Sequence, residues 1–172
     1  MSKSKIIACI CEGGAEHAIM DILLKNDVLR FQKKDLLDEK IIRTRSASEF
    51  QNVYLKKNFT SKITLYRILD SRRENFNLGK LYKDKVEVIN VVTAPEIEML
   101  IIHNENKYGD FKKSSKKPSE YCKENLKMHE VKSYKFTEKY FSDIYILTNA
   151  IKTHRRMSKI QKNEITLFDL LK

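Results

Sequence analysis

The chain has 172 residues, of which 41% are hydrophobic and 33% are charged, and its formal net charge is +11. This length suits one domain with a substantial core and is short for two ordinary domains. No apolar run approaches the roughly 20 residues that cross a bilayer, and the start does not resemble a signal peptide, so we expect a cytoplasmic protein without membrane insertion.

The positive charge favours polyanionic partners through an attraction that does not depend on their sequence. We therefore expect nucleic acid, either DNA or RNA, as a partner. The three cysteines do not have the spacing of a zinc site, because one residue separates Cys9 from Cys11 and Cys122 is distant. We expect all three to be reduced residues of the core.

The first predicted strand, residues 6–11, is a run of small and β-branched apolar residues that ends at Glu12-Gly13-Gly14. Beyond this break, apolar residues recur at helical spacing, which predicts a helix to Leu24 or Val28. Open α/β sheets bind ligands where strands end, so Glu12 is the first candidate functional residue. An acidic glycine turn before a helix also has a purely structural explanation.

The next two strands are predicted over residues 40–45 and 62–69. The first is short, and its Arg43 and Arg45 share a side. A capping-box pattern ending at Glu49 then predicts a helix. The second strand is rich in β-branched and aromatic residues and ends at Asp70, as a central strand would.

A fourth strand is predicted over residues 86–92, followed by a helix with Pro95 in its first turn. The alternation of strands and helices over residues 1–106 predicts an α/β fold with a mostly parallel, Rossmann-like sheet flanked by helices. Residues 107–172 are predicted to form a basic helical extension packed on this core as one structural domain. We expect a lysine-rich link at 112–117, short and long helices at 119–126 and 137–157, and a docked apolar tail.

Two of the predicted strands end in a carboxylate, at Glu12 and Asp70, and parallel strands end at the same edge of a sheet. Two carboxylates there can hold Mg²⁺ or Mn²⁺ or divide acid and base roles. Arg72 and Arg73 add donors for phosphate. Further basic candidates for phosphate contact are Lys112, Lys113, Lys116, Lys117, Arg155 and Arg156. A solvated loop is the simplest explanation of the four lysines, and the helix dipole alone would also favour the two arginines at a helix end.

A strand that ends in Glu12-Gly13, a helix, a βα unit and a strand that ends in Asp70 together resemble the TOPRIM domain of topoisomerases, primases and OLD-family nucleases. The resemblance covers residues 5–105. It implies that Glu12 is a general acid/base that also lies at the metal site, and that Asp70 is the principal magnesium ligand.

The segment from Ala94 to Ile102, APEIEMLII, is similar to a helix of RloB-type proteins, which are small TOPRIM proteins of restriction and phage-defence loci. By this resemblance Glu98 is a third acidic residue of the metal site. One position departs from the family pattern, because Arg72 stands where a second aspartate is expected two residues after Asp70.

These features predict a TOPRIM-type, metal-dependent nuclease or nuclease-like effector in bacterial or phage defence. The departure at Arg72 leaves an alternative open, in which the site is degenerate and the protein binds nucleic acid, a nucleotide or a partner without catalysis. A protein partner from the same defence system and self-association also stay open.

Overall fold

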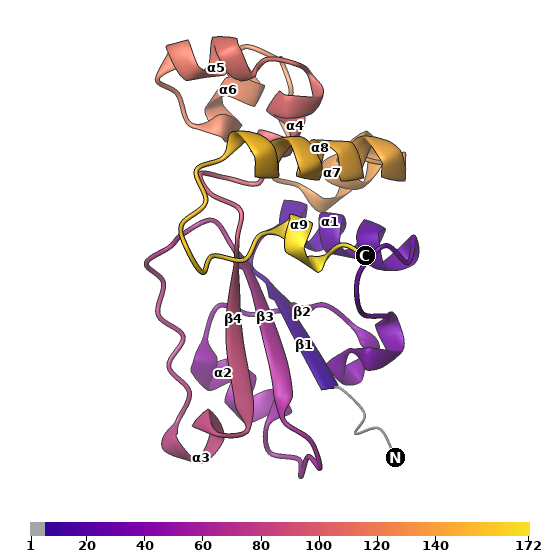
Figure 1. Ribbon diagram of the computed structural model, residues 1–172, viewed down its shortest axis with the longest axis vertical. Helices are drawn as coiled ribbons and strands as arrows, with labels where there is room; N and C mark the ends of the chain where they lie inside the picture. Colours follow the sequence, from indigo (N-terminus) through magenta and orange to yellow (C-terminus); the bar gives the residue numbers. More distant parts are fainter. Residues whose placement is uncertain (1–5) are drawn as a thin grey trace.

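The structure is a computed structural model that describes residues 6–172, and its centre is a four-stranded, all-parallel sheet in the order β2-β1-β3-β4 (Figure 1). The strands are β1 (Ile6–Cys11), β2 (Ile42–Arg43), β3 (Ile63–Leu69) and β4 (Val86–Val92). The helices of the core are α1 (Gly14–Lys25), η1 (Lys33–Asp35), η2 (Leu37–Glu39), α2 (Ala47–Tyr54), α3 (Lys80–Lys83) and α4 (Met99–Asn104). The C-terminal helices are α5 (Tyr108–Ser114), α6 (Pro118–Glu124), α7 (Tyr134–Tyr140), α8 (Ile144–Met157) and α9 (Leu167–Leu170).

The predicted α/β fold and all four predicted strands are confirmed. The two central strands, β1 and β3, pair along the whole of β1, from Ile6 opposite Ile63 to Cys11 opposite Ile68. Most of their residues are buried, as in a strand covered on both faces. Because all four strands run in the same direction, the residues that follow them meet at one edge of the sheet.

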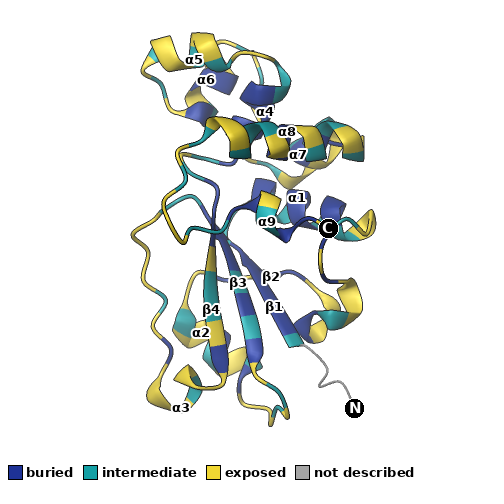
Figure 2. Cartoon of the chain, viewed as in Figure 1, coloured by how far each residue is buried: buried dark blue, intermediate teal, exposed yellow. Residues whose placement is uncertain are grey.

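Alternate residues of β1 enter two different hydrophobic clusters. Ile7, Cys9 and Cys11 pack in the larger one with α1, α4 and the C-terminal helices, whereas Ala8 and Ile10 face α2. The strands are buried over most of their length, and the exposed residues of α5 to α8 face outward (Figure 2). Both faces of the sheet are therefore covered.

The C-terminal helices share the larger cluster with the sheet, α1 and α4. Helix α7 lies against α1 and α8 lies against α4. The predicted apolar tail does dock, because Leu167 and Leu170 are buried and Ile165 pairs with Val91 beside β4. Cys9, Cys11 and Cys122 are buried free thiols, as expected. Among residues 6–172, no helix has the length and apolar character needed to cross a membrane.

Two helix predictions and one loop prediction were wrong in detail. Pro95 is not in a helical first turn, because α4 begins only at Met99. The carbonyls of residues 96–98 accept hydrogen bonds from amides three residues later, as in turns. The long helix predicted at 137–157 is interrupted, because Asp143 caps a new helix through the amide of Tyr145. The lysine link is not all loop, since Lys112 and its neighbour lie in α5.

Candidate functional site

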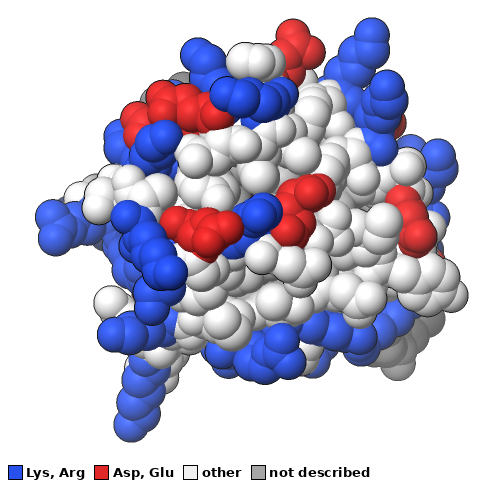
Figure 3. Space-filling view, turned by 90° about the horizontal axis from the view of Figure 1, so that it is seen from above, with Lys and Arg blue, Asp and Glu red and all other residues white. Residues whose placement is uncertain are grey.

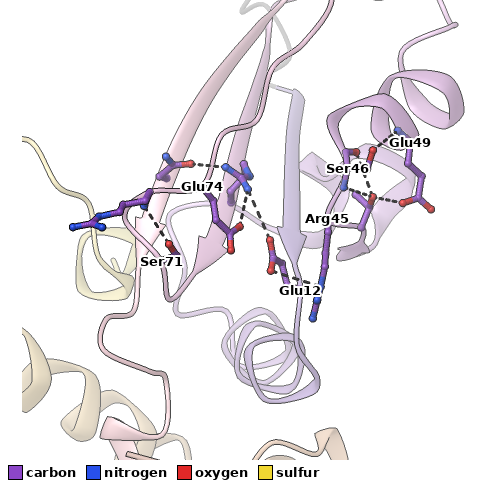
Figure 4. Close-up of polar contacts among 10 residues, drawn as sticks. Glu12, Arg45, Ser46, Glu49, Ser71 and Glu74 are labelled. Carbon is purple, nitrogen blue, oxygen red and sulfur yellow. Dashed lines mark hydrogen bonds and ion pairs between the residues drawn. The ribbon is translucent and has the colours of Figure 1, made fainter. Parts of the chain in front are cut away.

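Glu12 follows β1 at the carboxyl edge of the sheet, where it lies next to Arg45 (Figure 4) and Arg67. Its Oε2 lies 3.7 Å from Nε of Arg45, and its Oε1 lies 3.9 Å from Nη2 of Arg67. Burial raises the pKa of Glu12 and the neighbouring Glu74 raises it further, while the two arginines lower it. Glu12 therefore belongs to a charge cluster with Arg45, Arg67 and Glu74.

Asp70 follows β3 at the same edge. The hydroxyl of Thr93, which follows β4, donates a hydrogen bond of 2.5 Å to its Oδ1. Burial raises the pKa of Asp70 and this hydrogen bond lowers it. The ends of two adjacent strands thus fix the carboxylate.

The loop after β4 adds two more carboxylates, Glu96 and Glu98. Glu96 accepts hydrogen bonds from the amide of Ser119 at 2.8 Å and from Nζ of Lys132 at 3.3 Å. Glu98 is only 3% exposed, and within residues 6–172 its buried Oε2 has no hydrogen-bond partner. Burial raises the pKa of Glu98 to about 7, and the charges of Glu96 and Asp70 oppose the lowering effect of Lys132.

Glu16 was not among the residues predicted from the sequence. It lies between the cluster around Glu12 and the carboxylates around Asp70, because charges from both groups affect its pKa. Its carboxylate folds back over Gly13 at the start of α1, so that an added Cβ at Gly13 would meet Oε2 at 2.2 Å. Burial raises the pKa of Glu16, Asp70 raises it further, and Lys132 and Arg45 lower it. An acidic residue in a first helical turn is common, so the sequence carried no separate signal for it.

Lys132 is the second residue that the sequence analysis missed, and a close backbone approach brings it to the site. A Cβ at Gly14 would lie 3.0 Å from the carbonyl oxygen of Lys132 and 2.9 Å from the amide of Tyr134. The second glycine of the turn therefore allows the segment before α7 to cross the start of α1. The charges of Glu98, Glu96 and Asp70 raise the pKa of Lys132 against the effect of burial.

The predicted phosphate contacts fall into different places. Arg72 pairs with Glu164 through Nε, and its Nη2 donates to the other oxygen of that carboxylate at 3.1 Å. Arg73 is exposed, and its backbone amide donates to Ser71. The four lysines lie in or next to α5 and α6. Helices α4 and α8 separate α5 and α6 from the strand ends (Figure 1). They are Lys112, Lys113, Lys116 and Lys117, and Lys116 pairs with Glu124 at 2.7 Å.

Arg155 and Arg156 lie in the last turn of α8, and Arg155 lines a small pocket with Thr93 and Ile97. Next to them, the rings of His103 and His154 approach to 3.2 Å between nitrogens. Burial lowers the pKa of His154 to about 4. Seen from above, basic side chains lie around the edge of this face, with acidic side chains among them and near the centre (Figure 3). On this face the positive charge is therefore not gathered in one patch.

The carboxylates at the sheet edge fit a divalent cation by their chemistry. Asp70, Glu98 and Glu16 supply oxygen donors, the ligands that Mg²⁺ and Mn²⁺ prefer, and the buried Oε2 of Glu98 has no partner in the part of the chain that the structure describes. Glu12 contacts arginines instead. Within residues 6–172, no three such side chains already stand at ligating distances.

The fold and this site define a parallel α/β protein with several carboxylates at the carboxyl edge of its sheet. Comparison of the chain with protein-family models, curated proteins and solved structures gave no match.

Proposed function

We propose that the protein is a TOPRIM-type nuclease, a metal-dependent phosphodiester hydrolase that acts on nucleic acid. The observation that carries the proposal is the presence of Asp70 and Glu98 at the edge where α/β sheets bind ligands. Asp70 lies near enough for its charge to raise the pKa of Glu98, and the buried Oε2 of Glu98 has no partner in the described chain. The net charge of +11 supplies attraction for a polyanion. By the same family resemblance, we propose a role in bacterial or phage defence.

In this proposal Asp70 and Glu98 hold Mg²⁺ or Mn²⁺. The cation supplies a Lewis acid that polarises a phosphoryl oxygen and lowers the pKa of bound water. Glu12 acts as the general base. It takes the proton of the attacking water as the water oxygen bonds to phosphorus, and the leaving oxygen takes a proton from solvent as its bond to phosphorus breaks.

Lys132 favours a second candidate function. Its ammonium bonds to Glu96 and lies near Asp70 and Glu98, so it offsets their negative charge without a metal. A protein of this kind would bind nucleic acid, a nucleotide or a protein partner and would not cleave. Arg72 also supports this alternative, because it stands where the family pattern has a second aspartate, although its guanidinium pairs with Glu164.

The test is incubation of the pure protein with plasmid DNA, single-stranded DNA and transfer RNA, in Mg²⁺, in Mn²⁺ and in EDTA. We expect metal-dependent cleavage that Asp70→Asn, Glu98→Gln and Glu12→Gln each reduce by at least ~10²-fold. Glu87→Gln is the matched control, because Glu87 is an exposed carboxylate near the opposite end of β4. Absence of cleavage with salt-sensitive binding retained would favour the second candidate.

A further inference from the structure

The two arginines beside Glu12 differ in their exposure to solvent, and Figure 4 shows Arg45 next to Glu12. Arg67 approaches Oε1 and has a side chain that is 3% exposed, whereas Arg45 approaches Oε2 and has a side chain that is 77% exposed. One carboxylate is therefore held by one enclosed cation and one cation in contact with solvent.

Arg67 is fixed by its surroundings in the central strand β3. Its Nη1 donates to Oδ1 of Asn90 at 3.3 Å, and its Nη2 donates to Oε2 of Glu74 at 3.4 Å. Its guanidinium also lies 4.5 Å from the centre of the Phe76 ring. Moving Arg67 away from Glu12 would break all of these contacts.

Arg45 has few such restraints. Its only ion pair within residues 6–172 is the one with Glu12, and the separation of 3.7 Å exceeds that of a good hydrogen bond. A pair of this length contributes little to stability when one partner is exposed, because water solvates the Arg45 guanidinium even within the pair. The guanidinium therefore exchanges partners at small cost, and its planar set of donors matches a phosphate.

The position of Arg45 along the sheet edge also suits a phosphate contact. The strand order β2-β1-β3 places Arg45, Glu12 and Asp70 in succession along this edge. The charge of Arg45 reaches Glu16 as well, whose pKa it lowers after the larger effects of burial, Asp70 and Lys132. A phosphate bound by Arg45 would thus lie beside Glu12, toward Asp70.

We infer that Arg45 is the arginine that binds the substrate phosphate beside Glu12, and that it exchanges its contact with the Glu12 carboxylate for one with a nucleic-acid phosphodiester. This inference rests on the proposed function, since it concerns the same site. Arg67 stays on Glu12 as a positioning residue and keeps a positive charge beside it after Arg45 has moved. Arg72 cannot take this role while Glu164 holds it.

Binding of fluorescein-labelled DNA and RNA oligonucleotides of one sequence, measured by anisotropy in EDTA over a series of KCl concentrations, tests the inference. We expect Arg45→Ala to weaken binding by about tenfold and to reduce the salt slope by about one, as for loss of one phosphate contact. The arm with the larger change identifies the polymer. An unchanged slope in both arms would overturn the inference, as would wild-type protein that binds neither oligonucleotide.

A double-mutant cycle tests the exchange between Glu12 and the phosphate. Glu12→Gln should strengthen oligonucleotide binding, because it releases Arg45, and this gain should shrink severalfold in an Arg45→Ala background. Arg43→Ala is the matched control, since Arg43 is an exposed arginine at the end of β2, two residues before Arg45, and the gain should persist there in full. An equal gain in the Arg45→Ala background would contradict the exchange.

These measurements separate the inference from the proposed function because they need no cleavage. Binding that depends on Arg45, in a protein that cleaves nothing with either metal, would remove the nuclease and keep the phosphate contact. Metal-dependent cleavage, with oligonucleotide binding that Arg45→Ala leaves unchanged, would keep the nuclease and remove the phosphate contact of Arg45.

Discussion

The carboxyl group of Glu98 precedes α4 in a buried position, where its charged form is costly. Burial raises its pKa from 4.5 to about 7, so between these values the folded chain binds more protons than the unfolded chain. The free energy of unfolding therefore falls as pH rises through this window. The carboxylate at the proposed metal site is thus held at a cost in stability.

Glu98→Gln should remove this cost. We expect the variant to match the wild type at pH 4 and to be more stable at pH 8 by up to about 3 kcal/mol, because the pKa of Glu98 is 4.5 in the unfolded chain and about 7 in the folded chain. Urea unfolding at both pH values, without divalent cations, measures the difference. Equal stabilities at pH 8 would show that Glu98 ionises normally in the folded protein.

Burial of Arg67 also leads to a prediction about the free energy of unfolding. Arg67→Met would leave Glu12, Glu74 and Asn90 without their shared cation, and we expect it to cost about 2 kcal/mol, since the two carboxylates are partly solvated. Arg67→Lys keeps the charge and should recover part of the loss. Chemical denaturation of the two variants measures it, and equal losses would mean that packing, not charge, is the reason for an arginine here.

The turn between β1 and α1 carries the main expectation at the level of elements. An added methyl group at Gly14 would press on the backbone of residues 132–134, and backbone cannot move aside as a flexible side chain does. We expect Gly14→Ala to destabilise the protein by about 1–3 kcal/mol. It should also displace Lys132 from the carboxylates.

Gly109→Ala is the control for this substitution. Gly109 lies in α5 with nothing near the position of an added Cβ, so alanine there should stabilise the helix by up to about 1 kcal/mol. Thermal unfolding of both variants gives the comparison. If Gly14→Ala lowered the unfolding temperature no more than Gly109→Ala, residues 132–134 would not lie as close to Gly14 as the structure shows.

The elements show how far the sequence could predict the site. Both strand ends, Glu12 and Asp70, could be located because the apolar runs before them have the length and composition of buried strands. Glu16 and Lys132 could not, because one looks like an ordinary first-turn residue and the other reaches the site only through packing of the C-terminal segment. The pairing of Arg72 with Glu164 depends on packing in the same way.

The capping-box prediction also shows a limit of local patterns. Ser46 does accept a hydrogen bond from the amide of Glu49, at 3.2 Å. The Glu49 carboxylate, however, accepts from the hydroxyl of Thr44 and does not return to the amide of Ser46. A neighbouring hydroxyl outside the motif was the better partner.

At the scale of the whole molecule, one cluster unites the sheet with the C-terminal helices. Buried residues beyond position 106 in this cluster include Phe141, Leu147 and Ile151, and they pack with α1 and α4. We expect a chain ending at residue 106 to show no cooperative unfolding transition, because its larger sheet face would be exposed. Circular dichroism during urea titration checks this, and a sharp transition in the shortened chain would show that residues 6–106 fold independently.

The central claim is that the carboxylates gathered at the sheet edge form a divalent-cation site. Calorimetric titration of the whole protein with Mn²⁺ tests it most directly, with Asp70→Asn and Glu98→Gln beside the Glu87→Gln control. We predict saturable binding by the wild type and the control, abolished in Asp70→Asn and weakened by at least about tenfold in Glu98→Gln. Mn²⁺ binding of equal strength in all four proteins, or its absence from the wild type, would contradict the claim.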